Sequence, residues 1–404
     1  MTASGPARTP SLWSRVTVLT AVCLTVSCPA VPALANGDDG PAPRPAPARA
    51  VAAGVALKSP GLHVLPRDGS PEPPDDLSAL SWVVADARTG EVLAAKDAHL
   101  RLPPASTLKT LFAITVLPRF PQETNHIVSD AELEGIGEGS SRVGVQAGQT
   151  YTVADLWRGV FLSSGNDAVH VLARMNGSVS LTVAQMQAKA EMLGADDTEV
   201  ISPDGYDAPG QVSSAYDLTL FARAGLASPY FTGYTSTATA MFPGGEDPRG
   251  HAMPPFQIQN TNRLLTGADG LGRYPGLIGV KNGYTTNAGN TLITAARRGD
   301  RTLIATVMNP QSGQPQAVYR EARALLDWGF AAAGRTGSVG TLNTATRASA
   351  PRVRPTAAAL APVMTAVPAP DTGLSWIGWS AAGGAALAAT AGTVFARRRY
   401  LRAR

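Results

Sequence analysis

The chain has 404 residues, of which 44% are hydrophobic, and its formal net charge at pH 7 is +4. Seven of the 34 basic residues lie in residues 1–35 and 397–404, which contain no acidic residue, so 27 basic residues stand against 30 acidic ones elsewhere. Because this larger part is mildly acidic, we exclude nucleic acid as a partner. The only cysteines are Cys23 and Cys28, and the five histidines have no ligand spacing. The composition therefore predicts no disulfide framework, no metal site and no cofactor.

Residues 1–35 have the pattern of a secretory signal peptide. Two arginines precede an apolar run at residues 16–26, and Ala33-Leu34-Ala35 matches an A-x-A cleavage site. The run is too short to span a bilayer. A lipoprotein signal at Thr25-Val26-Ser27-Cys28 is a minor alternative, because it lacks the leucine that is usual three residues before the cysteine. Residues 36–76 follow as a linker rich in Pro and Ala.

A globular domain is predicted over residues 77–334. It opens with two strands, at residues 81–86 and 91–95, joined by a turn. An apolar stretch after Ser106 predicts a buried helix as far as residue 117. Further helices are predicted at residues 152–162, 167–175, 183–193, 215–227 and 317–330, and further strands at 277–280, 291–296 and 302–308. Strands at both ends with helices between them predict an α/β sandwich with a helical insertion.

The C-terminal residues indicate a membrane anchor. Residues 335–373 form a second linker, rich in Ala, Thr and Pro, and residues 374–396 contain no charge over a length that can span a bilayer. The arginine-rich residues 397–404 predict a cytoplasmic tail by the positive-inside rule. Pro370-Asp371-Thr372-Gly373 resembles a sortase sorting signal, whose use would join the protein to the cell wall after Thr372. We favour the retained transmembrane helix.

Ser106 and Lys109 form the first candidate catalytic pair. Their spacing of three residues puts both side chains on one face of the predicted helix. A serine hydroxyl becomes a nucleophile when a base takes its proton, and a lysine can be that base if burial and a neighbouring cation lower its pKa. A lone Ser-x-x-Lys is more readily explained as a helix N-cap beside a lysine that reaches solvent, so further motifs have to decide.

Two further motifs carry polar groups that such a site needs. Ser164-Gly165-Asn166 lies between two apolar helical stretches, where a tight loop can point a hydroxyl and an amide into a cleft. Its alternative is a plain helix–helix turn. Lys281-Asn282-Gly283-Tyr284 ends a short strand, where it can project a cation beside a backbone that is open to an extended substrate. Its alternative is a lysine that protects a sheet edge.

In this order, the three motifs resemble the S-x-x-K, S-x-N and K-T-G set of penicillin-binding proteins and serine β-lactamases. Their spacing, together with stretches such as Ser202-Pro203-Asp204-Gly205-Tyr206, is most similar to low-molecular-mass D-alanyl-D-alanine carboxypeptidases of serine peptidase family S11. The resemblance covers residues 77–330. It implies an α/β (α+β) sandwich, with an antiparallel sheet flanked by helices and an all-helical insertion.

The resemblance also implies acyl transfer on peptidoglycan stem peptides, with β-lactams as competing ligands. It assigns Ser106 as the nucleophile, Lys109 as its general base and Ser164 as a proton relay. Lys281 is expected to keep Lys109 neutral, and the backbone N–H groups of Ser106 and Tyr284 to form the oxyanion hole. The implied substrate-binding residues are Asn166, Lys281, Asn282, Gly283 and Tyr284.

Two departures from the family pattern concern the substrate carboxylate. Asn282 stands in place of a threonine, and residues 311–319 contain no arginine where members often have one, Arg320 being the nearest. These departures leave open a weakly active or non-catalytic penicillin-binding wall protein. A β-lactamase-like hydrolase is the other alternative. However, Glu199 in residues 196–204 has no accompanying asparagine, which predicts slow release of penicillin.

Overall fold

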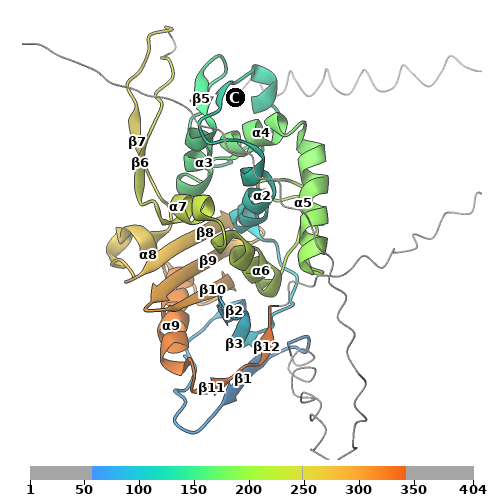
Figure 1. Cartoon of the computed structure of the whole chain (residues 1–404), viewed down its shortest axis with the longest axis vertical. Coiled ribbons are helices and arrows are strands. Elements are labelled where there is room, and N and C mark those ends of the chain that lie inside the picture. Colours follow the sequence, from blue (N-terminus) through green and yellow to red (C-terminus); the bar gives the residue numbers. More distant parts are fainter. Residues whose placement is uncertain (1–56, 248, 343–404) are drawn as a thin grey trace, which may run out of the picture. The chain divides into compact units, whose positions relative to one another are not determined.

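The computed structural model describes residues 57–247 and 249–342 (Figure 1). The predicted signal peptide, most of the second linker, the transmembrane segment and the basic tail lie outside the described residues, so these assignments stay predictions. Within the described ranges, no helix combines the length and the apolar character that crossing a membrane requires.

An antiparallel sheet of eight strands forms the centre of the fold, which confirms the predicted sheet. The strand order is β11-β1-β3-β2-β10-β9-β8, with β12 paired to β3. The strands are β1 (Leu62–Pro66), β2 (Ala79–Asp86), β3 (Glu91–Lys96), β8 (Leu277–Thr285), β9 (Gly289–Arg298), β10 (Arg301–Pro310), β11 (Thr336–Gly337) and β12 (Gly340–Thr341). In the part of the chain that the structure describes, β8 pairs only with β9, so one of its backbone edges has no strand partner.

Side chains along the central strand β2 point alternately to the two faces of the sheet, and helices cover both faces. Val83 belongs to the core that contains α2 (Lys109–Val116) and α6 (Ala215–Leu226), whereas Trp82 packs with α9 (Ala317–Ala332). Successive strand side chains point to opposite faces, so a strand covered on both faces is apolar throughout. Figure 1 shows α6 and α9 on opposite sides of the sheet.

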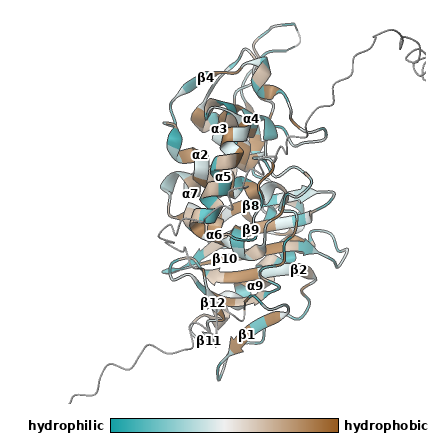
Figure 2. Cartoon of the chain, turned by 90° about the vertical axis from the view of Figure 1, so that its right-hand side faces the viewer, coloured by the Kyte–Doolittle hydropathy of each residue, from teal (hydrophilic) through white to brown (hydrophobic). Residues whose placement is uncertain are grey.

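The predicted helical insertion lies between β3 and β8, together with two small two-stranded sheets, β4–β5 and β6–β7. Besides α2 and α6, its elements are η1 (Ala105–Leu108), η2 (Leu117–Arg119), β4 (Asn125–Ile127), η3 (Asp130–Leu133), β5 (Thr150–Thr152), α3 (Val153–Leu162), α4 (Asn166–Met175), α5 (Val179–Leu193), α7 (Pro229–Ser236), β6 (Thr239–Phe242), β7 (Phe256–Gln259), α8 (Arg263–Thr266) and η4 (Ala268–Gly270). Figure 2 shows the hydrophobic residues of α2 among these helices. The ring of Phe112 on α2 lies 5.4 Å from that of Trp157 on α3, so packing fixes the helix that carries the first motif.

The start of α3 shows how local sequence places an element of the site. The Thr152 side chain accepts a hydrogen bond from the Asp155 N–H, and the Asp155 carboxylate accepts one from the Thr152 N–H. This reciprocal capping box satisfies two backbone donors at the helix start. The predicted helix start at Thr152 is thereby confirmed.

The sheet extends past both predicted ends of the domain, residues 77 and 334. β1 lies inside the region predicted as linker, yet it pairs with β3 and β11, and Leu57 before it is only 2% exposed. At the other end, β12 extends the sheet past residue 334 by pairing with β3. These strands are short and gain their partners from distant parts of the chain, so their own sequences carry little signal. The helix α7 and the β6–β7 pair also have no predicted counterpart.

Candidate active site

Ser106 lies in η1, which runs directly into α2. The residue before it, Ala105, has a φ of 50°, in the left-handed region that non-glycine residues rarely adopt. The Pro104 carbonyl oxygen accepts hydrogen bonds from the hydroxyls of Thr107 at 2.5 Å and Thr291 at 3.0 Å. Because Thr291 belongs to β9, this strained turn is bound to the sheet, and Ser106 is held beside it.

Lys109 is fully buried at the start of α2, and its amine contacts three oxygen atoms. Nζ lies 2.8 Å from Ser106 Oγ, 2.7 Å from Asn166 Oδ1 and 2.7 Å from the backbone oxygen of Asp204. These partners come from η1, from α4 and from the loop between α5 and α6. One buried amine therefore joins three segments of the chain and brings the serine and lysine of the first motif into hydrogen-bond contact.

Burial controls the proton affinity of both lysines of the three motifs. It lowers the pKa of Lys109 to about 8, against the opposing effect of the Asp204 and Asp167 carboxylates, which favour the ammonium form. Lys281 is 1% exposed, and burial, followed by the charge of Lys109, lowers its pKa well below the usual lysine value. A neutral Lys109 that can take a proton from Ser106 is therefore accessible near neutral pH.

Ser164 and Asn166 come from the loop that joins α3 to α4. Ser164 has a φ of 57° and is 6% exposed, and its hydroxyl has no hydrogen-bond partner among the residues that the structure describes. Asn166 contacts Lys109 through Oδ1 and donates from Nδ2 to Ser140 Oγ at 3.0 Å. The second motif thus supplies one amide that contacts Lys109 and one buried hydroxyl with no partner in the described part of the chain.

The third motif lies on the edge strand β8. Lys281 Nζ donates to the backbone oxygen of Asn282 at 2.7 Å. Asn282 Oδ1 accepts from Thr261 Oγ1 at 2.9 Å, so the side-chain amide presents its Nδ2 hydrogens as donors on the other side. Gly283 approaches η1 so closely that a Cβ atom there would lie 2.6 Å from the Ser106 nitrogen. The backbone of β8 therefore passes directly beside the Ser106 amide.

A cleft of about 250 Å³ connects the motifs, and Ser106 and Asn166 both line it. Residues 138–141 and Tyr206 form part of its lining, together with residues 284–286 at the end of β8. Residues 143–145, which follow the lining residues 138–141, donate their backbone N–H groups to the buried Asp167 carboxylate. The cleft is thus an opening beside the nucleophile, bounded by the free edge of the sheet.

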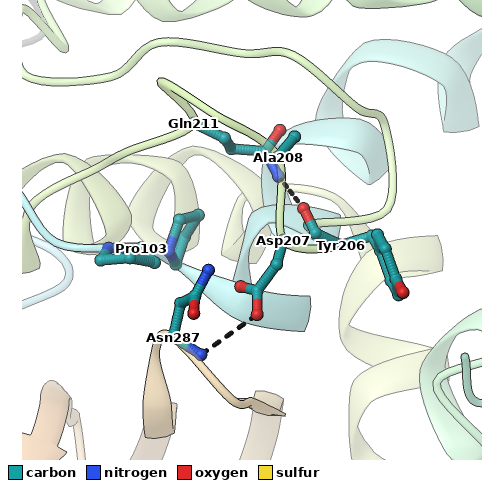
Figure 3. Close-up of a pocket in the computed structure, with 8 residues that line it drawn as sticks. Pro103, Tyr206, Asp207, Ala208, Gln211 and Asn287 are labelled. Atoms are coloured by element: carbon teal, nitrogen blue, oxygen red, sulfur yellow. Dashed lines mark hydrogen bonds between the residues drawn. The ribbon is translucent and has the colours of Figure 1, made fainter. Parts of the chain in front are cut away.

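A smaller pocket lies beside the cleft (Figure 3). Hydrogen bonds around it connect the loop of residues 205–208 to the segment that follows β8. Asp207 Oδ2 accepts from the backbone N–H of Asn287 at 3.1 Å, and Oδ1 accepts from Thr285 Oγ1 at 2.7 Å. Gln211 Nε2 donates to the Tyr206 carbonyl oxygen at 2.6 Å. The loop that carries Asp207 is thereby fastened to the end of β8 and to the turn that follows it.

Asp204 and His170 belong to the site, although neither was predicted as a site residue from the sequence. The Asp204 carbonyl oxygen contacts Lys109, and its carboxylate lies 3.5 Å from His170 Nε2. Burial favours the protonated carboxyl, but the hydrogen bond with His170 and the charge of Lys109 outweigh it and lower the pKa of Asp204 to about 2. The stretch around Asp204 is one of those that resemble the family, but it carries no signal of a contact with Lys109.

Comparison with known proteins gives this geometry a family. A family model described as D-alanyl-D-alanine carboxypeptidase matches residues 68–312. The chain is 39% identical over 266 residues to D-alanyl-D-alanine carboxypeptidase DacB2 of Mycobacterium tuberculosis, covering 64% of this chain and 84% of that protein. It is 34% identical over 273 residues to D-alanyl-D-alanine carboxypeptidase DacD of Escherichia coli, covering 64% of this chain and 65% of that protein.

Solved structures share the fold. The crystal structure of a D-alanyl-D-alanine carboxypeptidase from Mycobacterium tuberculosis matches with a TM-score of 0.60 and 39% identity, covering 69% of this chain and all of that one. The Streptomyces K15 DD-transpeptidase matches with a TM-score of 0.58 and 27% identity, covering 65% of this chain and all of that one. The chain belongs to the D-alanyl-D-alanine carboxypeptidase family of serine peptidases. The fold, family and hydrolase class predicted from the sequence are confirmed.

The close approach of Gly283 to Ser106 predicts the effect of adding one methyl group. In Gly283→Ala the new Cβ meets backbone at 2.6 Å, so either β8 or the Ser106 amide has to shift. We expect acylation by a fluorescent penicillin to slow by about 100-fold, the usual loss when an oxyanion-hole donor is misplaced. Gly233→Ala on α7 is the matched control, because no atom lies within 4 Å of its new Cβ. Equal acylation rates for the two variants would contradict the placement of β8.

Proposed function

We propose that this chain removes the terminal D-alanine from peptidoglycan stem pentapeptides through an acyl-enzyme on Ser106, and that penicillin acylates the same serine. The observation that carries the proposal is the 2.8 Å contact between the Lys109 amine and the Ser106 hydroxyl, in the fold of this family. A serine beside a buried lysine with a lowered pKa is an activated nucleophile.

The proposed reaction uses each motif for one task. Neutral Lys109 takes the Ser106 proton while Oγ attacks the carbonyl carbon of the penultimate D-alanine. The backbone N–H groups of Ser106 and Tyr284 donate to the oxyanion. The proton then passes through Ser164 to the leaving amine as the C–N bond breaks and free D-alanine departs. Water hydrolyses the remaining ester, which releases the shortened peptide and regenerates Ser106. The Ser164 hydroxyl is buried and has no hydrogen-bond partner within residues 57–247 and 249–342, which supports its role as relay.

In this proposal the third motif binds the substrate. The extended peptide lies along the free edge of β8, with its backbone near Gly283 and Tyr284, and the Asn282 Nδ2 hydrogens donate to its terminal carboxylate. The hydrogen bond from Thr261 supports this orientation of the Asn282 amide, because it occupies Oδ1. In its protonated form, Lys281 adds a positive field from the same strand.

A β-lactamase-like activity has less support. Glu199 is exposed and its backbone pairs with Val212, and it is absent from the described residues that line the cleft. The two carboxylates in that lining belong to Glu138 and Asp207, and Asp207 is already hydrogen-bonded to Thr285 and Asn287. We therefore expect the penicilloyl ester on Ser106 to persist.

Replacement of the nucleophile tests the proposal. Ser106→Ala removes the attacking oxygen, so we expect no covalent label from fluorescent penicillin and no D-alanine release from an acylated peptide that ends in D-Ala-D-Ala. Ser180→Ala, an exposed serine at the start of α5, should retain both. Labelling of Ser106→Ala would sink the nucleophile assignment. Labelling of the unaltered chain without D-alanine release would favour the non-catalytic penicillin-binding alternative.

Asn282 is predicted to hold the substrate carboxylate. Asn282→Ala removes a donor to a charged group, which costs about 1.5–3 kcal/mol, so kcat/KM for the D-Ala-D-Ala peptide should fall at least about tenfold. Asn282→Thr keeps a donor at this position and should lose about threefold or less. The measurement is D-alanine release at several peptide concentrations. Equal losses for the two variants would show that the donor has no part in binding.

The family acts on the cell wall, so we propose that the chain is exported by residues 1–35 and held in the membrane by residues 374–396. Deleting residues 374–404 should release the protein into the medium of a suitable bacterial host, as judged by fluorescent-penicillin labelling of cell fractions. A full-length chain that resists detergent and leaves the wall only after muramidase digestion would instead indicate the sortase-linked form.

A further inference from the structure

A buried carboxylate belongs to the residue whose backbone oxygen contacts Lys109. Asp204 is 2% exposed and belongs to the loop between α5 and α6. Its backbone oxygen accepts from Lys109 at 2.7 Å, and its Oδ1 accepts from Ser202 Oγ at 2.8 Å and from the Tyr206 N–H at 2.9 Å. The residue therefore contacts the lysine by its main chain, while its side-chain charge is held inside the same loop.

His170 holds the other oxygen of this carboxylate. It lies four residues after Asn166 on α4, so the two side chains share a helix face, one against Lys109 and the other against Asp204. The buried ring has Nε2 at 3.5 Å from Asp204 Oδ2 and Nδ1 at 3.3 Å from the backbone oxygen of Glu134. Both neighbours are acceptors, so the ring N–H has an acceptor beside it in either tautomer.

Five polar or charged residues surround the Lys109 amine or act on its charge. Ser106 and Asn166 are neutral and contact it directly. Asp204 and Asp167 contribute negative charge that favours the ammonium form, Asp204 more strongly. Lys281 is also close, because the charge of Lys109 adds to burial in lowering the Lys281 pKa. Asp204 thus has the greatest influence among the charges that oppose the burial of Lys109.

We propose that Asp204 and His170 are a positioning pair that sets the pH at which Lys109 becomes the base for Ser106. The proposal rests on the function proposed above, in which Lys109 takes the serine proton. The Asp204 carboxylate stabilises the ammonium that forms when Ser106 attacks, and in the free enzyme it holds Lys109 protonated to a higher pH. His170 keeps the carboxylate in place through its N–H donor.

The test is the pH dependence of acylation of the full chain by a fluorescent penicillin, between about pH 5.5 and 9.5. The second-order rate constant of the unaltered chain should rise with pH, with a midpoint near the Lys109 pKa of about 8. Asp204→Asn keeps the side-chain shape but removes the negative charge, which disfavours the ammonium. Its midpoint should therefore move to lower pH by about one unit.

A matched control separates charge from structural damage. Asp207→Asn removes a carboxylate of the same loop that is bonded to Thr285 and Asn287 rather than to the region of Lys109. Its midpoint should stay with that of the unaltered chain, whatever happens to its plateau. Each profile is normalised to its own plateau, so partial unfolding lowers the amplitude and leaves the midpoint in place. A midpoint for Asp204→Asn equal to that of the unaltered chain overturns the proposal.

A second pair of variants tests His170, and it decides the question if Asp204→Asn yields no folded protein. His170→Gln keeps an N–H donor for Asp204, whereas His170→Leu removes it. We expect the plateau rate of the glutamine variant to stay within about twofold of the unaltered chain, and that of the leucine variant to fall about tenfold. Equal losses in the two variants overturn the positioning role.

The two proposals fail in different ways. If Ser106→Ala is labelled as fast as the unaltered chain, the proposed function fails, and the role of Asp204 and His170 fails with it. If labelling needs Ser106 but the Asp204→Asn midpoint does not move, the function stands and only this inference is lost.

Discussion

The burial of the Lys109 amine is the constraint on which the rest of the site depends. A buried ammonium or amine without hydrogen-bond partners is costly, so its contacts with Ser106, Asn166 and the Asp204 carbonyl have to form together. Three segments that are distant in sequence, η1, α4 and the loop before α6, therefore converge at one nitrogen atom. The same burial lowers the pKa of the lysine, so the interaction that assembles the site also makes its base available.

Unusual backbone surrounds this centre. Ala105, directly before the first motif, and Ser164, within the second, adopt left-handed conformations, and such strain persists only where neighbours hold it. The Pro104 carbonyl supplies one such restraint through its bonds to two threonines. Gly205 supplies another, because a Cβ there would lie 1.9 Å from the Ala105 oxygen. The backbone at Gly205 thus packs directly against the backbone before the nucleophile, with no room for a side chain between them.

The elements predicted from the sequence were those with a strong local signal. β2 is apolar on both faces, and α3 begins with a capping box, so both were found close to their observed ends. β1 was missed because a five-residue strand among prolines gains its stability from β3 and β11, far along the chain. The β6–β7 pair was missed because its strands are only four residues long and carry little pattern of their own.

The sequence by itself determined the chemistry that the chain carries: a serine and a lysine on one helix face, and a hydroxyl, an amide and a second lysine in later motifs. It also determined the order in which these groups occur, from which the family followed. Tertiary structure alone decided that Lys109 is fully buried, that the Asp204 backbone oxygen contacts its amine, and that His170 lies beside the Asp204 carboxylate. Desolvation and the influence of neighbouring charge depend on which distant segments pack together, and no local pattern encodes that.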